Sequence, residues 1–423
     1  MVASERHARA HNAGMTTRKR TTKTSAQPAL PQDDTLTQPQ TLLGGLSAEA
    51  FMRRHWQKKP LLIRQAVPDV RPPVTRAELF NLAAQDDVES RLIVRRPEAR
   101  AGKAVPKGEA DWQLKRGPLV RRSLPPLSQP GWTVLVQGLD LHVPAAHELL
   151  KRFRFVPDAR LDDVMISFAT DTGGVGPHYD SYDVFLLQVS GRRRWRIAPL
   201  TDRRLQPGVP LKILSHFQAE QEWVLEPGDM LYLPPGWAHD GVAEGDDCMT
   251  CSVGFRVPEE TGLTRELLLR WADELSAPEV PTLYRDPKQP ATAQPGRIPE
   301  GLQTFASKAV TRLLSDPQGL MSALGEVLTE PKPNVWFEAG EPLADGQGVR
   351  LDARTKMMYD DRRIFANGES WLAAGKDARA LQQLADERRL SAQAVSRCSP
   401  AVRELLMQWA DDGWLHPDQE CGS

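Results

Sequence analysis

A short segment between residues 173 and 180 carries side chains that can bind a metal ion. It reads Gly-Gly-Val-Gly-Pro-His-Tyr-Asp, and it ends on His178 and Asp180. Residues two apart on a β-strand point to the same face, so this imidazole and this carboxylate can converge on one ion. The pair alone is weak evidence. Nine histidines in 423 residues make a chance His-x-Asp common, and a structural pair is the alternative.

His239 is the third candidate ligand, and it follows the turn Pro234-Pro235-Gly236. Two histidines and one carboxylate on one side of ferrous iron leave three positions open, which a bidentate 2-oxo acid and dioxygen can take. A closed zinc site would need a fourth ligand, usually cysteine. The pair Cys248-x-x-Cys251 has no second pair and lies in a predicted strand, so we interpret it as core.

Two further side chains can hold an acidic co-substrate. Arg193 lies on the strand predicted to follow the first ligand strand. A buried guanidinium there can pair bidentately with a carboxylate. Ser167, between two apolar residues, can donate to the same carboxylate; a satisfied core serine is the alternative.

Three residues beside the first ligands are candidate substrate contacts: Tyr179, Tyr182 and Asp183. Aromatic rings and a carboxylate suit a cationic guest such as an arginine side chain. Barrel packing or ordinary exposure is the alternative for each of them.

Short β-rich runs between Gly and Pro turns must position these side chains, and their spacing predicts an all-β sandwich or barrel. The runs are 164–169, 183–189, 194–197, 222–225, 230–233 and 250–257. Upstream, Ser47 is a predicted helix cap, and Thr75 with Glu78 forms a predicted capping box. A helix is expected over 145–153, and strands over 60–63, 92–94 and 132–136.

Helices dominate the rest of the chain. We expect them over 264–275 and 302–328, separated by a Pro-rich linker, and then over 377–385, 391–396 and 400–410. Two short strands, 349–351 and 356–359, precede the last three and suggest a winged-helix-like module. Residues 334–423 hold 15 acidic and 11 basic residues, which opposes a direct nucleic-acid contact.

Composition narrows the class of protein. The formal net charge is −1, 40% of residues are hydrophobic, and four cysteines form no disulfide framework, so a globular protein of the reducing cytoplasm is expected. No apolar run is long enough for a membrane span. Residues 1–31 hold six basic residues and one acidic residue. This composition predicts a disordered tail. Electrostatic tethering to RNA or to an acidic surface is the alternative interpretation. Translation could also begin at Met15, which would shorten the tail.

Together these motifs resemble the JmjC-type 2-oxoglutarate oxygenases, a branch of the cupin superfamily, and most closely the bacterial ribosomal oxygenases. Segments that carry the resemblance include 51–60, 162–168, 182–185 and 252–256. It spans about residues 42–423 and implies an α+β chain: a JmjC/cupin double-stranded β-helix (jelly-roll barrel), a helical dimerisation region and a C-terminal winged-helix-like module. The expected domains are 1–40 (tail), 41–258 (catalytic), 259–330 (dimerisation) and 331–423 (winged helix).

The resemblance also implies an activity. His178, Asp180 and His239 would bind Fe(II), and Arg193 the far carboxylate of 2-oxoglutarate, with O2 as the other co-substrate. The implied reaction is hydroxylation of an arginyl residue in a large-subunit ribosomal protein (the one numbered sixteen) by a cytoplasmic homodimer. Open alternatives are a histidyl hydroxylase, a tRNA-modifying oxygenase, a lysine demethylase, and a ribosome-binding cupin without turnover.

Overall fold

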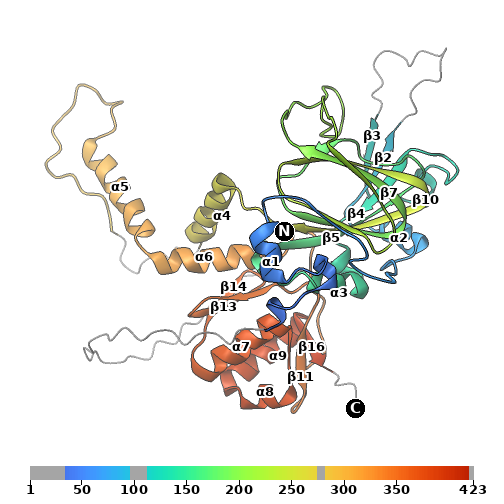
Figure 1. Ribbon diagram of the computed structural model, residues 1–423. Coiled ribbons are helices and arrows are strands. Elements are labelled where there is room, and N and C mark those ends of the chain that lie inside the picture. The colour runs from blue at the N-terminus through green and yellow to red at the C-terminus, as the bar shows by residue number, and fades with distance from the viewer. Residues whose placement is uncertain (1–33, 96–111, 274–281, 419–423) are drawn as a thin grey trace.

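The computed structural model describes residues 34–95, 112–273 and 282–418. Nearly all of the basic tail predicted to be disordered lies outside the described residues. A β-barrel, a projecting set of helices and a smaller C-terminal unit follow one another along the chain (Figure 1). Within the described ranges, no helix is long and apolar enough to cross a membrane.

Local signals define the helices that precede and flank the barrel. Helix α1 (Ala48–Arg54) begins after Ser47, whose hydroxyl accepts a hydrogen bond from the Ala50 amide at 3.1 Å. Helix α2 (Arg76–Leu82) begins with the predicted capping box of Thr75 and Glu78. Helix α3 (Pro144–Lys151) begins with proline, whose fixed φ and missing N–H suit a first turn. All three predicted helices are confirmed.

The barrel is one sheet of ten strands in the order β1-β9-β7-β10-β5-β4-β2-β3, with β6 paired to β10 and β8 paired to β7. Its strands are β1 (Leu61–Ile63), β2 (Ser90–Arg95), β3 (Trp112–Arg116), β4 (Trp132–Val136), β5 (Leu161–Ala169), β6 (His178–Tyr179), β7 (Val184–Pro199), β8 (Gln221–Leu225), β9 (Met230–Leu233) and β10 (Trp237–Phe255).

Two long strands replace shorter predicted ones. The runs 183–189 and 194–197 are a single strand, β7, because Gly191 bends the strand at a φ of 61° without ending it. Strand β10 begins at Trp237 rather than at residue 250, and it therefore contains His239. The longer strands matter because β7 carries Arg193 and β10 carries His239.

The two faces of the barrel sheet have different neighbours. On the outer face, aromatic residues of α2 and of the turn after α3 pack against the strands: Phe80 lies 5.2 Å from Phe168, and Phe153 lies 4.9 Å from Phe185, between ring centroids. These rings belong to the largest buried cluster. The inner face holds a second cluster of buried hydrophobic residues. Along β7, this cluster contains the even-numbered Val184 and Leu186 before Gly191, but the odd-numbered Trp195 and Ile197 after it. Gly191 thus shifts the alternation by one residue.

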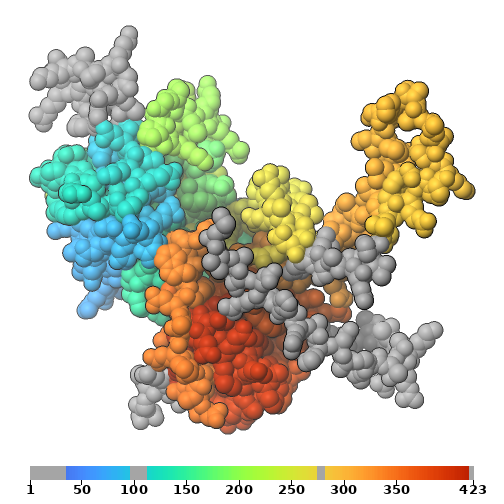
Figure 2. Space-filling view, turned by 180° about the vertical axis from the view of Figure 1, so that it is seen from behind, coloured from blue at the N-terminus to red at the C-terminus, as the bar shows by residue number. Residues whose placement is uncertain are grey.

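Helices α4 (Glu260–Asp273), α5 (Glu300–Leu314) and α6 (Pro317–Thr329) follow the barrel. The single segment predicted over 302–328 is in fact two helices, because Asp316 caps the second one and Pro317 starts it. Helix α5 projects away from the rest of the molecule (Figures 1 and 2).

The C-terminal unit contains two three-stranded sheets and three helices, in keeping with the winged-helix-like module expected there. Its elements are β11 (Gly348–Leu351), β12 (Met357–Tyr359), β13 (Arg363–Ala366), β14 (Glu369–Leu372), α7 (Gly375–Glu387), β15 (Arg389–Leu390), α8 (Ala392–Arg397), α9 (Pro400–Asp411) and β16 (Leu415–Asp418). The hairpin β13–β14 was not predicted, although Asn367-Gly368 between two apolar runs is a standard hairpin signal.

Candidate metal and co-substrate site

The three predicted metal ligands lie together on the inner face of the barrel. His178, Asp180 and His239 each offer one ligand atom, and these atoms all lie within 4.8 Å of one another. The two imidazole centroids are 4.2 Å apart, and His239 Nε2 is 3.6 Å from Asp180 Oδ2. Strand pairing explains the meeting: His178 of β6 is directly opposite His239 of β10, and opposed residues share a face.

Each histidine is held through its other ring nitrogen. His178 Nδ1 lies 2.8 Å from the Gly176 carbonyl, and His239 Nδ1 lies 3.0 Å from the Trp237 carbonyl. A proton on Nδ1 that is donated to these carbonyls leaves Nε2 free as a ligand. Burial, and then the neighbouring His178, lower the pKa of His239 to about 4, so its ring is neutral at physiological pH. This donor set fits a divalent transition metal such as Fe(II).

The loop before the ligands depends on Gly176. Its φ is 78°, and a Cβ there would lie 3.0 Å from both Ile213 and Trp112. The turn after β9 is hydrogen-bonded to the segment that contains Asp180, because the Gly236 amide donates to the Asp180 carbonyl at 3.1 Å. The segments that carry the ligands are therefore joined by backbone as well as by their side chains.

Arg193 is a buried cation on the same face. Only 3% of the residue is exposed, and it lies opposite Ala243 of β10. Its Nη1 donates to the Gly241 carbonyl at 3.3 Å, while Nε and Nη2 have no hydrogen-bond partner within the described ranges. A buried guanidinium with two free donors fits the carboxylate of a bound co-substrate.

Ser167 also faces inward, because its strand pairs it with Thr250 of β10. Its hydroxyl donates to the Thr250 carbonyl at 3.4 Å. Thr250 in turn donates to buried Gln188 at 2.9 Å. The inner face around Ser167 is therefore polar and can accept a charged co-substrate.

Trp195 is an additional site residue to which sequence reasoning gave no function. Its ring centroid lies 5.9 Å from that of His239, and the Arg193 Cζ lies 5.8 Å from the indole. The indole N–H is buried and has no partner among the described residues. Its sequence signal was its position two residues after Arg193, which places both side chains on one face.

The predicted substrate contacts are divided by the fold. Tyr179 and Tyr182 flank the candidate metal ligand Asp180, and Tyr182 is 39% exposed. Partial burial and the Asp180 carboxylate raise the pKa of the Tyr182 phenol. Asp183 points to the outer face, where it is fully buried and accepts hydrogen bonds from Tyr232 at 2.6 Å and Gln57 at 3.1 Å.

The barrel and its site define a class. A His-Asp-His cluster beside a buried arginine, on the inner face of a jelly-roll barrel, is the arrangement of a JmjC oxygenase that uses Fe(II) and 2-oxoglutarate. The chain matches the JmjC domain family over residues 148–263 and the ROXA-like winged-helix family over residues 312–416.

Similar proteins refine this class. The chain is 34% identical over 334 residues to the ribosomal protein uL16 3-hydroxylase of Escherichia coli, covering 75% of this chain and 84% of the relative. It is 30% identical to a probable ribosomal oxygenase of Haemophilus influenzae, covering 87% and 96%. A structure of E. coli YcfD with cobalt and 2-oxoglutarate has a TM-score of 0.69 and 29% identity, covering 88% and 98%. The chain belongs to the JmjC ribosomal oxygenases.

Proposed function

We propose that this enzyme hydroxylates an arginyl residue of a large-subunit ribosomal protein, using Fe(II), 2-oxoglutarate and O2, in the cytoplasm. The observation that carries the proposal is the metal cluster next to Arg193, whose buried guanidinium keeps two donors free of any partner among the described residues. The identity to a uL16 3-hydroxylase supports a ribosomal substrate.

The residues have distinct tasks in this reaction. His178, Asp180 and His239 would hold the metal, with their Nδ1 contacts fixing the two rings. Arg193 would bind the far carboxylate of 2-oxoglutarate and so orient its other end toward the metal, with Ser167 as a second donor. When bound, the metal and co-substrates supply an oxidant that can hydroxylate an unactivated carbon. The protein supplies orientation and a pocket that excludes water.

The choice of an arginyl side chain rests on the residues beside Asp180. The ring of Tyr179 already lies beside a guanidinium, because the Cζ of Arg203 is 6.0 Å from the ring centroid. An aromatic face of this kind attracts a cationic guest. Tyr182 offers a second, partly exposed ring. The carboxylate of Asp183 would act only indirectly, because it is buried behind the sheet. A histidyl target is the second candidate.

Intact masses of ribosomal proteins from cells with and without the gene test the substrate. We expect one large-subunit protein to lose the mass of one oxygen atom in the deletion strain, and fragmentation to place the oxygen on arginine. A histidine position would overturn the arginyl assignment. If no ribosomal protein changes, the substrate lies elsewhere, and the tRNA-modifying and non-catalytic alternatives take precedence.

Asp180→Ala tests the metal site in the purified protein. We expect the variant to keep the parent's circular dichroism and to lose both metal binding and substrate-coupled succinate release, because one charged ligand is gone. Asp171→Ala, outside the cluster, is the matched control for metal affinity. A metal titration curve for Asp180→Ala that equals the parent's would refute the ligand assignment.

The same proposal includes a homodimer formed through the projecting helices. Apolar side chains are exposed along α4 and α5, including Leu268 (44%), Leu269 (61%) and Val310 (57%). Exposed apolar residues gathered on helices are typical of an interface. We assign the winged helix no direct contact with nucleic acid, because its part of the chain is acidic.

A further inference from the structure

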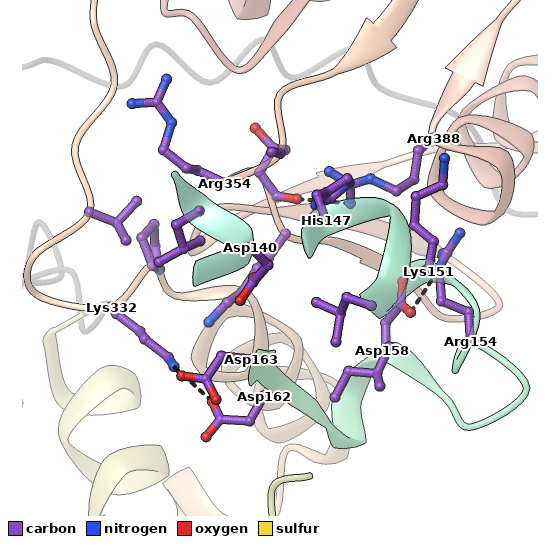
Figure 3. A pocket seen from close by; sticks show the side chains of 18 of the residues that line it. Asp140, His147, Lys151, Arg154, Asp158, Asp162, Asp163, Lys332, Arg354 and Arg388 are labelled. Atoms are coloured by element: carbon purple, nitrogen blue, oxygen red, sulfur yellow. Dashed lines mark hydrogen bonds and ion pairs between the residues drawn. The ribbon is translucent and has the colours of Figure 1, made fainter. Parts of the chain in front are cut away.

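A cleft separate from the metal centre lies between the barrel and the C-terminal unit (Figure 3). Helix α3 and the start of β5 form its wall on the barrel side. The segment after α6, strand β12 and Arg388 form the other side. Its volume is about 90 Å³. Apolar side chains contribute to both walls: Leu141, Leu150, Leu161, Val335 and Met358.

Positive charge predominates in this cleft. Four aspartates line it: Asp140, Asp158, Asp162 and Asp163. Seven cationic side chains line it as well: Lys151, Arg154, Arg256, Lys332, Arg354, Lys356 and Arg388. The lining therefore has more cations than carboxylates, before His147 is considered.

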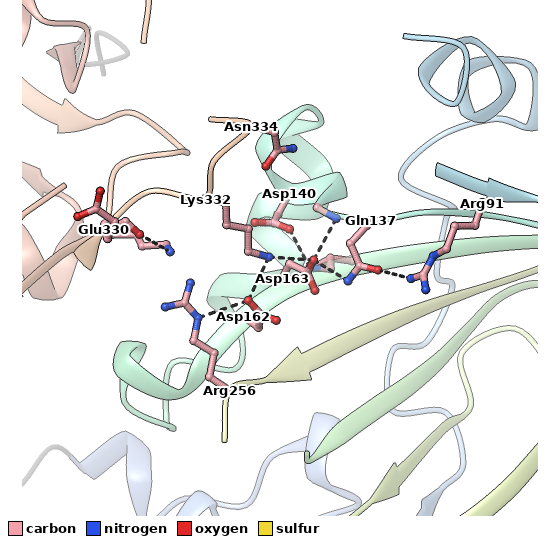
Figure 4. A network of polar contacts seen from close by, with 12 residues as sticks. Arg91, Gln137, Asp140, Asp162, Asp163, Arg256, Glu330, Lys332 and Asn334 are labelled. Carbon is pink, nitrogen blue, oxygen red and sulfur yellow. Dashed lines mark hydrogen bonds and ion pairs between the residues drawn. The ribbon is translucent and has the colours of Figure 1, made fainter. Parts of the chain in front are cut away.

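Most of these cations have a carboxylate partner. Lys332 Nζ lies 3.0 Å from Asp162 and 3.2 Å from Asp163, in the network that joins the segment after α6 to β5 (Figure 4). Arg154 pairs with Asp158 at 2.6 Å. Arg256, Arg354 and Lys151 pair with Asp162, Asp352 and Glu148.

Lys356 and Arg388 differ from the others, because neither makes an ion pair with a carboxylate in the part of the chain that the structure describes. Lys356 Nζ donates to the Glu330 carbonyl at 3.0 Å. Arg388 donates to the carbonyls of Thr355 at 3.1 Å and Asp352 at 2.6 Å. Both side chains are half-buried. Cations that are partly withdrawn from water are normally paired, since leaving them without a counter-ion is unfavourable.

The pKa shifts in the cleft agree with a missing counter-ion. Burial, and then Arg256 and Lys332, lower the pKa of Lys356 to about 7. Burial and Arg154 lower the pKa of Arg388 to about 10. Burial raises the pKa of Asp140 to about 7, which reduces the negative charge in the cleft at neutral pH.

We propose that this cleft is a second binding site, for a small organic anion with carboxylate or phosphate groups, and that Lys356 and Arg388 are its ionic contacts. The two cations supply the charge that the ligand would neutralise, and the leucine, valine and methionine walls suit its carbon skeleton. Because the walls come from both the barrel and the winged helix, the ligand would stabilise their junction. The site does not depend on the proposed hydroxylation.

Thermal unfolding of the metal-free full-length protein tests this site, with inorganic phosphate and citrate as probes and sodium chloride at matched ionic strength as the control. We expect a saturable rise in Tm with at least one probe, beyond the rise in chloride, because a ligand that binds only the folded state stabilises it. A response to phosphate alone indicates a phosphate-bearing ligand, and a response to citrate indicates a carboxylate.

Substitutions test whether the rise in Tm comes from ligand binding in this cleft. Lys356→Met and Arg388→Met should each lose it, whereas Lys308→Met on exposed α5 and Arg193→Met at the co-substrate site should keep it. Should Lys356→Met fail to fold, calorimetric titration of the parent and of Arg388→Lys with the same probe replaces it, with at least tenfold weaker binding expected. No saturable rise in the parent, or an equal rise in Lys356→Met and Lys308→Met, overturns the proposal.

Discussion

Arg193 carries the most direct prediction at the scale of a single residue. Changing Arg193 to Met removes the charge but keeps much of the apolar stem. Hydrogen bonds to charged groups are worth about 1.5–3 kcal/mol, so the KM for 2-oxoglutarate should rise roughly ten- to hundredfold. Steady-state kinetics with varied 2-oxoglutarate measure it.

The neighbouring Arg194 provides the matched control for that change. It is exposed on the opposite face and pairs with Glu222 and Glu244. Arg194→Met should leave the KM for 2-oxoglutarate unchanged. If Arg193→Met and Arg194→Met have the same KM as the parent, the co-substrate carboxylate is bound by another residue.

At the scale of an element, the bend in β7 decides which of its side chains share a face with the candidate metal ligands. A Cβ on Gly191 would lie 2.9 Å from the Cys248 Cα, and φ is 61°. Gly191→Ala should therefore lower the free energy of unfolding by about 1–3 kcal/mol and also raise the KM for 2-oxoglutarate, because Arg193 shifts. Urea unfolding and kinetics measure the two effects.

Gly245 is the control that separates the steric clash of an added Cβ from the strain of a positive φ. Its φ is 79°, but a Cβ added there would have no atom of the described residues within 4 Å. Gly245→Ala should lose only the smaller, conformational part of the stability, and should not change the KM. An equal loss in both variants would mean that close packing against Cys248 does not determine the bend.

The sheet of the winged helix contains a pH-dependent contact. Burial alone would raise the pKa of Asp352, but hydrogen bonds from Arg354 and His416, each at 2.8 Å, outweigh burial and lower it to about 2. Because the folded pKa lies below the unfolded value of about 3.9, this contact stabilises the protein above pH 4 and is lost as pH falls toward 2.

Asp352→Asn should consequently reduce the free energy of unfolding by about 2 kcal/mol at pH 7, and by about half as much at pH 3. Chemical denaturation at the two pH values measures the difference from the parent. Asp345→Asn, on an exposed turn, is the control and should have little effect. A deficit that is the same at pH 7 and pH 3 would contradict the ionic origin.

At the scale of the whole molecule, the exposed leucines of α4 predict the oligomeric state. Leu269→Asp places a charge in the proposed interface, so the variant should be monomeric where the parent is a dimer, as measured by light scattering after gel filtration. Leu372→Asp is the control, because Leu372 is 77% exposed on β14 of the winged helix. A monomeric parent would remove the homodimer from the proposal.

Sequence reasoning succeeded where the interactions are local. The caps of α1 and α2 depend on residues three apart, and both appear as predicted. The candidate metal ligands were found from residue type and spacing, because the coordination chemistry of two histidines and a carboxylate is independent of the rest of the chain. The resemblance to JmjC oxygenases added the barrel, which the strand pattern alone left open between a barrel and a sandwich.

Only the tertiary structure decided the features that depend on distant segments. Strand pairing made β7 continuous through Gly191 and brought Trp195 beside His239. Alternation and burial turned Asp183 to the outer face, where Tyr232 and Gln57 bind it. The pairing of Lys332 with Asp162 and Asp163, and the lack of such a partner for Lys356 among the described residues, arise from contacts between domains. Charge neutralisation and side-chain burial are properties of assembled neighbours, so the order of residues by itself does not determine them.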